Sequence, residues 1–181
     1  MGHIRSINIS TAKGGPKHPI PQAHLVKDWG IKGDGHGGPG QKQVSLLAWE
    51  RTLAMRAKGA AVGHGSFGEN ITTVGIDLRS LSVGDRLKLG DRGIVEVAEL
   101  GKECPAPCAI FRQVGSCIMP EEGVFCRVTK GGAIRVGDPV VIKGSGLRIT
   151  INRMKESRNT IRAPRGRKRE RDQGGHRGGE R

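Results

Sequence analysis

The chain of 181 residues is long enough for one domain with a hydrophobic core and a short extension. No stretch approaches the ~20 apolar residues that a membrane-spanning helix needs, and no apolar signal segment follows Met1. We therefore expect a cytoplasmic protein without membrane association. Thirty glycines, five phenylalanines and tryptophans together, and no tyrosine are typical of a turn-rich fold of many short strands.

The net charge of +14 is concentrated at the C-terminus. Residues 147–181 hold twelve of the 31 lysines and arginines but only four of the 17 acidic residues. We predict a folded domain over 1–146, then a short strand at 147–151 and a disordered basic tail. Such a tail can bind nucleic acid or another polyanion by counterion release, although it lacks aromatic residues for base stacking. The alternative is a solvated tail that only aids solubility.

The first half of the chain predicts one strand, several loops and one helix. The alternation over 2–10 predicts a short strand, and the prolines near 18–24 indicate an extended loop. A weak strand or turn at 26–31 leads into a glycine-dense loop at 33–40. Good helix formers at 48–59, with Trp49, Leu53 and Ala57 at helical spacing, predict a helix whose long apolar residues contact the core.

The second half of the chain predicts strands that follow matching turns. Val83-Gly84-Asp85 precedes alternating leucines at 86–89, and an alternating run at 94–100 follows it. The same Val-Gly-Asp turn recurs at 136–138, before the apolar residues 140–142. Many short strands with one convincing helix favour a mostly β fold, a closed β-barrel with one or two flanking helices.

Two cysteines follow the strand at 94–100. Cys104 and Cys108 lie in a proline-punctuated loop, and Lys102 beside them favours a thiolate. Simple packing is the alternative, since free cysteines are usually buried. The spacing of the four cysteines does not fit a structural zinc site, and nothing indicates an oxidising compartment for disulfides. We expect Cys117 and Cys126 to flank or enter apolar strands, and Cys104 to react with alkylating reagents faster than either.

Five motifs occur in an order that resembles the MOSC domain, the module at the C-terminus of molybdenum cofactor sulfurases. The match covers about residues 2–143 and is nearest to small stand-alone bacterial members. The motifs are the glycine-rich 33–38, Gln43-Val44-Ser45-Leu46-Leu47, the Phe-Gly-Glu-Asn segment 67–73, the turn and leucines at 83–90, and the cysteine after Val95-Glu96-Val97.

The resemblance places the defining cysteine of the family at Cys104, or at Cys108 if the loop is aligned with a gap of four residues. Two departures weaken an expected anion contact. The family often has arginine two residues before the Val-Ser-Leu-Leu run, where this chain has Lys42-Gln43, and a small residue other than glycine at position 35.

The resemblance implies a site for the molybdenum cofactor, which needs cations and amides for its phosphate and a soft ligand for its metal. At the level of the family it also implies binding of molybdenum ions and of pyridoxal phosphate. The candidate metal ligand is Cys104. Asn70 either forms hydrogen bonds with the edge of the pterin or holds a neighbouring loop. The glycine-rich loop either binds phosphate or is a flexible turn. The candidate cofactor-binding residues are Asp34, His36, Glu69, Asn70, Lys102 and Arg112.

Three functions remain open. Cys104 can carry a persulfide from a sulfur donor to a molybdoenzyme partner, with Cys108 resolving it as a disulfide. It can instead bind molybdenum directly, for reduction of N-hydroxylated compounds with an external electron partner. Alternatively, the chain is a basic polyanion-binding module without catalysis and with inert cysteines.

Overall fold

The computed structural model describes residues 1–102, 104 and 107–144. Its main feature is a closed barrel of seven strands, so the predicted fold class is confirmed. The predicted strand at 147–151 and the basic tail lie outside the described residues. The barrel strands are β1 (Gly2–Ile9), β5 (Val44–Ala48), β6 (Ile71–Val74), β7 (Arg86–Leu89), β8 (Gly93–Leu100), β9 (Val124–Lys130) and β11 (Pro139–Ile142).

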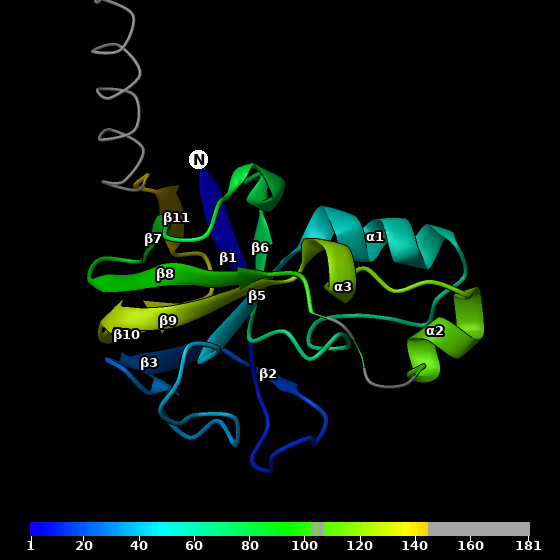
Figure 1. The fold of residues 1–181 in the computed structure, drawn as a ribbon, viewed down its shortest axis with the longest axis horizontal. Coiled ribbons are helices and arrows are strands. Elements are labelled where there is room, and N and C mark those ends of the chain that lie inside the picture. Colours follow the sequence, from blue (N-terminus) through cyan, green and yellow to red (C-terminus); the bar gives the residue numbers. More distant parts are fainter. Residues whose placement is uncertain (103, 105–106, 145–181) are drawn as a thin grey trace, which may run out of the picture. The chain divides into compact units, whose positions relative to one another are not determined.

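The strands follow the order β11-β7-β8-β9-β5-β6-β1 around the barrel, and β1 pairs with β11 to close it (Figure 1). In the closing pair Gly2 lies opposite Val140. Strands β5 and β6 pair in parallel, which requires a crossover connection, and the first helix provides it. Closure leaves these strands with partners on both sides, so no long barrel edge is offered to other chains.

The barrel interior is filled by every second residue along the strands, the residues whose side chains face inward. In β8, Val95 and Val97 are buried while Glu96 between them is not. Leu87 and Leu89 of β7 follow the same period of two. A shift of one residue would turn these side chains to solvent, so the pattern fixes the register.

The two Val-Gly-Asp segments form matching turns, as the sequence predicts. Gly84 and Gly137 have φ angles of +89° and +91°, which residues with a Cβ rarely adopt. In each turn the aspartate accepts a backbone hydrogen bond from three residues upstream, Asp85 from Ser82 and Asp138 from Arg135, both at 2.8 Å. The Gly-Asp pairs therefore set the entry of β7 and β11.

Residues 18–24 were expected to be an extended loop, and that expectation is wrong. They form β2 (His18–Ile20) and most of β3 (Gln22–Val26). Strand β2 pairs with β1 at the edge of the main sheet. Pro19 has no backbone N–H to donate, and an edge strand tolerates this because one of its sides has no partner strand. Strand β3 pairs with β10 (Gly132–Arg135) and with β4 (Gly30–Ile31) in a separate three-stranded sheet.

The predicted helix is present as α1 (Trp49–Ala57), but its predicted core face is wrong. Leu53 is 45% exposed, whereas Thr52 and Met55 are buried. The buried face is set by how α1 lies across β5 and β6, and a nine-residue helix has too few turns for its apolar spacing to reveal that face.

Two further short helices, α2 (Ala109–Val114) and α3 (Met119–Glu122), lie with α1 at one end of the barrel, and η1 (Leu78–Ser80) is a single 3-10 turn (Figure 1). The helices share a second small core that includes Leu47, Met55, Met119 and Phe125. Within the described residues, no helix is long and apolar enough to cross a membrane.

Candidate functional site

A buried ion pair anchors the glycine-rich loop. Asp34 follows β4, and its side chain is fully enclosed. Lys17 Nζ lies 3.0 Å from both of its carboxylate oxygens. The Ser10 N–H and the Asn70 side chain donate further hydrogen bonds, each at 2.9 Å. Burial raises the pKa of Asp34, but these donors and the Lys17 charge outweigh it, so the pKa lies below its ordinary value.

Asn70 uses its amide to hold the segments around it. Its Nδ2 donates to the Asn8 carbonyl at 3.2 Å as well as to Asp34, and its Oδ1 accepts from the Ser45 N–H at 3.2 Å. Of the two roles weighed for Asn70, these contacts favour holding neighbouring loops. Asn70 still lines the cavity described below, so a ligand there would meet a side chain that is already fixed.

Glu69, next to it, is fully buried and lies away from the cavity lining. Its carboxylate accepts from the Gly65 N–H at 2.7 Å, the Phe67 N–H at 3.1 Å and the Thr72 hydroxyl at 3.0 Å. Burial raises its pKa, against the effect of these donors. The arrangement fixes the loop before β6 and leaves Glu69 no direct access to a ligand in the cavity.

A cavity of about 220 Å³ brings four predicted residues together from separate parts of the chain. They are His36 from the glycine-rich loop, Asn70 from the start of β6, and Lys102 and Cys104 from the loop after β8. The remaining lining residues are Lys17, Lys42, Gln43, Ser45, Phe67, Gly68, Met119 and Phe125. Because strands β5, β6, β8 and β9 are neighbours, their ends and loops can form one wall.

The cavity carries positive charge. Three lysines line it, and no carboxylate is among its described lining residues. Lys17 is paired with Asp34, and Lys42 Nζ lies 2.6 Å from Glu99. Lys102 Nζ lies 5.9 Å from the centre of the Phe125 ring, within the range of a cation–π contact. Among the described residues Lys102 is therefore the lining lysine without a carboxylate contact, and an anionic group in the cavity would be attracted chiefly to it.

His36 lines this cavity as a neutral side chain. Its Nε2 accepts a hydrogen bond from the Gly14 N–H at 3.1 Å, and its Nδ1 faces Asp34 at 3.9 Å. Burial lowers the pKa of His36, and the positive charge of Lys17 lowers it further. The lowered pKa favours the neutral imidazole, and its hydrogen bond ties the glycine-rich loop to the segment around Gly14.

The four cysteines have different surroundings. Cys104 is exposed and lines the cavity, whereas Cys108 is exposed at the N-cap of α2 and lies off the lining. Cys126 is buried in β9, as expected, and burial raises its pKa. Cys117 was expected beside an apolar strand, but it is half-buried between α2 and α3, packed against the second core. The chain reversal after α2, which periodicity does not reveal, places it there.

Arg112, a predicted phosphate contact, lies on α2 away from the cavity lining, and its Nη2 donates to the Pro107 carbonyl at 3.1 Å. Sequence reasoning missed Lys17 as a lining residue, since an isolated lysine next to Pro16 gave no signal. The sequence also suggested that Lys42-Gln43, in place of the arginine common in the family, weakens an anion contact. The structure instead places a cation from this position at the cavity.

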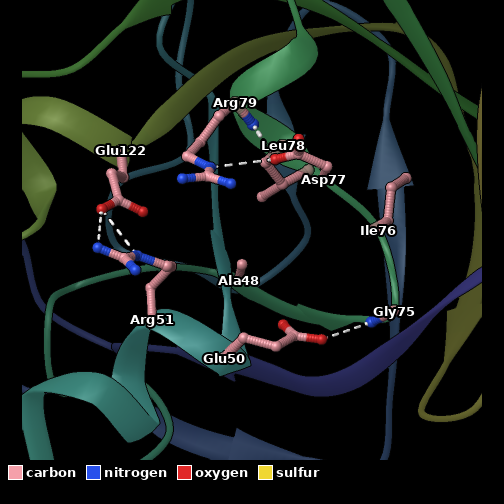
Figure 2. Close-up of a pocket in the computed structure, with 9 residues that line it drawn as sticks. All are labelled: Ala48, Glu50, Arg51, Gly75, Ile76, Asp77, Leu78, Arg79 and Glu122. Carbon is pink, nitrogen blue, oxygen red and sulfur yellow. Dashed lines mark hydrogen bonds and ion pairs between the residues drawn. The ribbon is translucent and has the colours of Figure 1, made fainter.

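A second, larger cavity of about 340 Å³ lies between α1, α3 and the turn after β6 (Figure 2). Both of its arginines are paired with carboxylates, and Glu50 accepts a hydrogen bond from the Gly75 N–H. Figure 2 shows Arg51 joined to Glu122 and Arg79 joined to Asp77. None of the cysteines lines it. It therefore offers an anionic ligand fewer available cations than the cavity beside Cys104, despite its greater volume.

The chain matches the model of the MOSC domain over residues 32–141, more than half of its length. It therefore belongs to the MOSC domain family, which is associated with molybdenum cofactor-related proteins. No curated protein sequence matches the chain.

Solved structures share the fold. YuaD from Bacillus subtilis is 18% identical with a TM-score of 0.66, and the match covers 77% of this chain and 94% of that one. YiiM from Geobacillus stearothermophilus is 22% identical with a TM-score of 0.57, over 78% of this chain and 75% of that one. YiiM from Escherichia coli is 16% identical with a TM-score of 0.52, over 78% and 69%. At these identities the likeness shows the barrel and carries no residue roles.

Proposed function

We propose that the cavity beside Cys104 binds the molybdenum cofactor, with the Cys104 thiolate as the protein ligand of its metal. One observation carries this proposal: the exposed Cys104 and three lysines line the same cavity, with no carboxylate among its described lining residues. A soft thiolate suits molybdenum, and cations suit a phosphate. A cavity with only one of these features would fit many other ligands.

The residues fit the cofactor in three ways. Within the described residues Lys102 has no carboxylate contact and lies near the Phe125 ring, so it is the cation best placed to meet a phosphate. Phe125 and Met119 supply an apolar wall for a flat heterocycle such as a pterin. The described residues contain no group of three or more His, Cys, Asp and Glu side chains that could hold a metal ion by themselves. A metal at Cys104 would therefore take its other ligands from the cofactor.

When bound, the cofactor supplies a metal with redox and sulfur chemistry that no side chain offers. The chain contributes binding and orientation. Lys17 is held in place by Asp34, whose carboxylate offsets its charge, and burial lowers its pKa, so Lys17 contributes a fixed part of the wall. Asn70, fixed by its own hydrogen bonds, forms part of the cavity wall. Reduction of N-hydroxylated compounds is one activity that such a site would support with an external electron donor.

A sulfur carrier is the competing candidate, and one observation favours it. Cys104 is exposed at the cavity, where a donor can reach its thiol. In this function the Cys104 thiolate takes the terminal sulfur of a donor persulfide, and the donor leaves as a thiol. The resulting persulfide would face the same lysines, which stabilise its negative charge.

The test is co-purification from a host that makes the cofactor. Molybdenum is measured by mass spectrometry of the metal, and pterin by fluorescence after oxidation. We expect both to accompany the wild-type protein, molybdenum to be lost in Cys104→Ser, and both to fall in Lys102→Ala. Lys58→Ala, at an exposed lysine after α1, is the matched control and should behave as wild type.

The outcomes separate the candidates. Wild-type protein that carries neither molybdenum nor pterin would overturn cofactor binding. If that protein instead accepts radioactive sulfur on Cys104 from a cysteine desulfurase, the sulfur-carrier function holds. A protein that carries no cofactor and accepts no sulfur would contradict both.

A further inference from the structure

A β-bulge in β8 turns Glu99 away from the barrel interior. Val97 faces inward, so a regular strand would place the carboxylate two residues later on the same buried face. The register instead steps from Val97 opposite Cys126 to Glu99 opposite Phe125, which leaves Ala98 as an extra residue on β8. The extra residue brings Glu99 to the face of the sheet that Phe125 occupies, where its side chain is 40% exposed.

On that face Glu99 binds Lys42, the residue before the start of β5 is reached at Gln43. The Nζ of Lys42 lies 2.6 Å and 2.5 Å from the two carboxylate oxygens. Lys42 lines the cavity beside Cys104, whereas Glu99 is not among the described lining residues. Gln43 fixes the backbone here, because its N–H donates to the Cys126 carbonyl and its side-chain oxygen accepts from the Val128 N–H, both at 2.9 Å. The backbone at Lys42 is therefore tied to β9 while its ammonium group is held by β8.

Lys42 and Lys102 both lie beside the ring of Phe125, each with its Nζ 5.9 Å from the ring centre. All three residues line the cavity. Among the described residues Lys102 has no carboxylate contact, so the two lysines differ through Glu99. The pair of Lys42 and Glu99 is half-exposed, with side chains 43% and 40% exposed, so water screens its attraction. An anion in the cavity can therefore compete with Glu99 for Lys42.

We propose that Glu99 sets the anion affinity of the cavity by acting as the competing counterion of Lys42. Without a bound anion, Glu99 holds the ammonium group and offsets its charge. When a phosphate group enters, Lys42 contacts it together with Lys102, and the ion pair with Glu99 weakens. The affinity is lower than two unpaired lysines would give. This inference rests on the proposed function, because it takes the same cavity as the site of the cofactor phosphate.

The test is a titration of the full-length protein with inorganic phosphate at neutral pH and constant ionic strength. Binding is followed by the NMR shifts of the backbone amides of Gly68 and Asn70, which line the cavity. Glu99→Gln keeps the shape of the side chain and removes its charge. We expect the dissociation constant for phosphate to fall about 2- to 5-fold, the range that an exposed ion pair supports. Lys42→Met should weaken binding, and adding Glu99→Gln to Lys42→Met should then give no gain.

Glu96→Gln is the matched control. Glu96 lies on the same strand and pairs with Arg86 and Arg127, and it is not among the described lining residues of the cavity. This variant should bind phosphate as wild type does, whereas a general effect of net charge would appear equally in it. Circular dichroism should show the wild-type fold in each variant, since a half-exposed ion pair adds little stability.

Three results would overturn the inference: unchanged or weaker binding in Glu99→Gln, a gain that persists without Lys42, or no phosphate response in any variant. The titration uses no cofactor. Purified protein without molybdenum and pterin would therefore contradict the proposed function and leave the role of Glu99 toward phosphate intact. Conversely, co-purified cofactor with no gain in Glu99→Gln would contradict only the role of Glu99.

Discussion

Replacing Asp34 by asparagine removes the negative charge that Lys17 meets inside the protein. The Lys17 and Asp34 side chains are 3% and 0% exposed, and Nζ lies 3.0 Å from both carboxylate oxygens. Removing one partner of a buried ion pair costs about 3–5 kcal/mol, because the remaining charge has lost its counterion but not its burial. Asparagine keeps the shape and one acceptor oxygen. We therefore expect a loss of about 3 kcal/mol, at the lower end of this range.

The geometry explains why the loss should not be smaller. The carboxylate accepts from the Ser10 N–H, the Asn70 amide and Lys17. The single amide oxygen of asparagine cannot satisfy all three, and its NH₂ group would face another donor. Asp28→Asn is the matched control. Asp28 is an exposed residue with a φ of +55°, a conformation that asparagine tolerates, and its ion pairs are on the surface. We expect this control to change stability by less than ~1 kcal/mol.

The assay is urea unfolding followed by circular dichroism, with stability taken from the midpoint at constant slope. The pH dependence gives a second check. Because the pKa of Asp34 is lowered in the folded state, its stabilising effect is present above the ordinary aspartate pKa and is lost as pH falls through the lowered value. The difference between wild type and Asp34→Asn should therefore shrink in acid. An Asp34→Asn protein as stable as Asp28→Asn at neutral pH would refute the reasoning.

Three further outcomes are expected. Truncation after Gly146 should leave the melting midpoint within a few degrees, since the removed sequence is rich in charged and poor in apolar residues; loss of folded protein would contradict the predicted boundary. The truncated protein should also lose most of the salt dependence of binding to heparin or duplex DNA, and an unchanged slope would place the anion site in the domain. In limited alkylation at pH 7, the exposed Cys104 and Cys108 should label before Cys126, and equal slow labelling of all cysteines would indicate inert thiols.

The arrangement of the cavity explains which site residues could be foreseen. Cys104 and Lys102 were predicted because a thiol and a cation follow a clear strand in one short loop. Lys17 was not, since it joins them only through strand pairings that link distant parts of the chain. Glu69 is a carboxylate within the Phe-Gly-Glu-Asn motif, yet it accepts hydrogen bonds from backbone N–H groups of the loop that precedes β6.

The sequence by itself determined strands β1, β7, β8 and β11, the two Val-Gly-Asp turns and the loop with Cys104, because alternation, glycine conformation and loop composition are local properties of the chain. The tertiary structure decided the rest. Closure of the barrel between β1 and β11 selects which loops share a wall, and the packing of α1 exposes Leu53 while it buries Met55. The reversal at Gly115 places Cys117 between α2 and α3, against the second core. Contacts of this kind depend on the order and register of strands far apart in sequence, which no local pattern encodes.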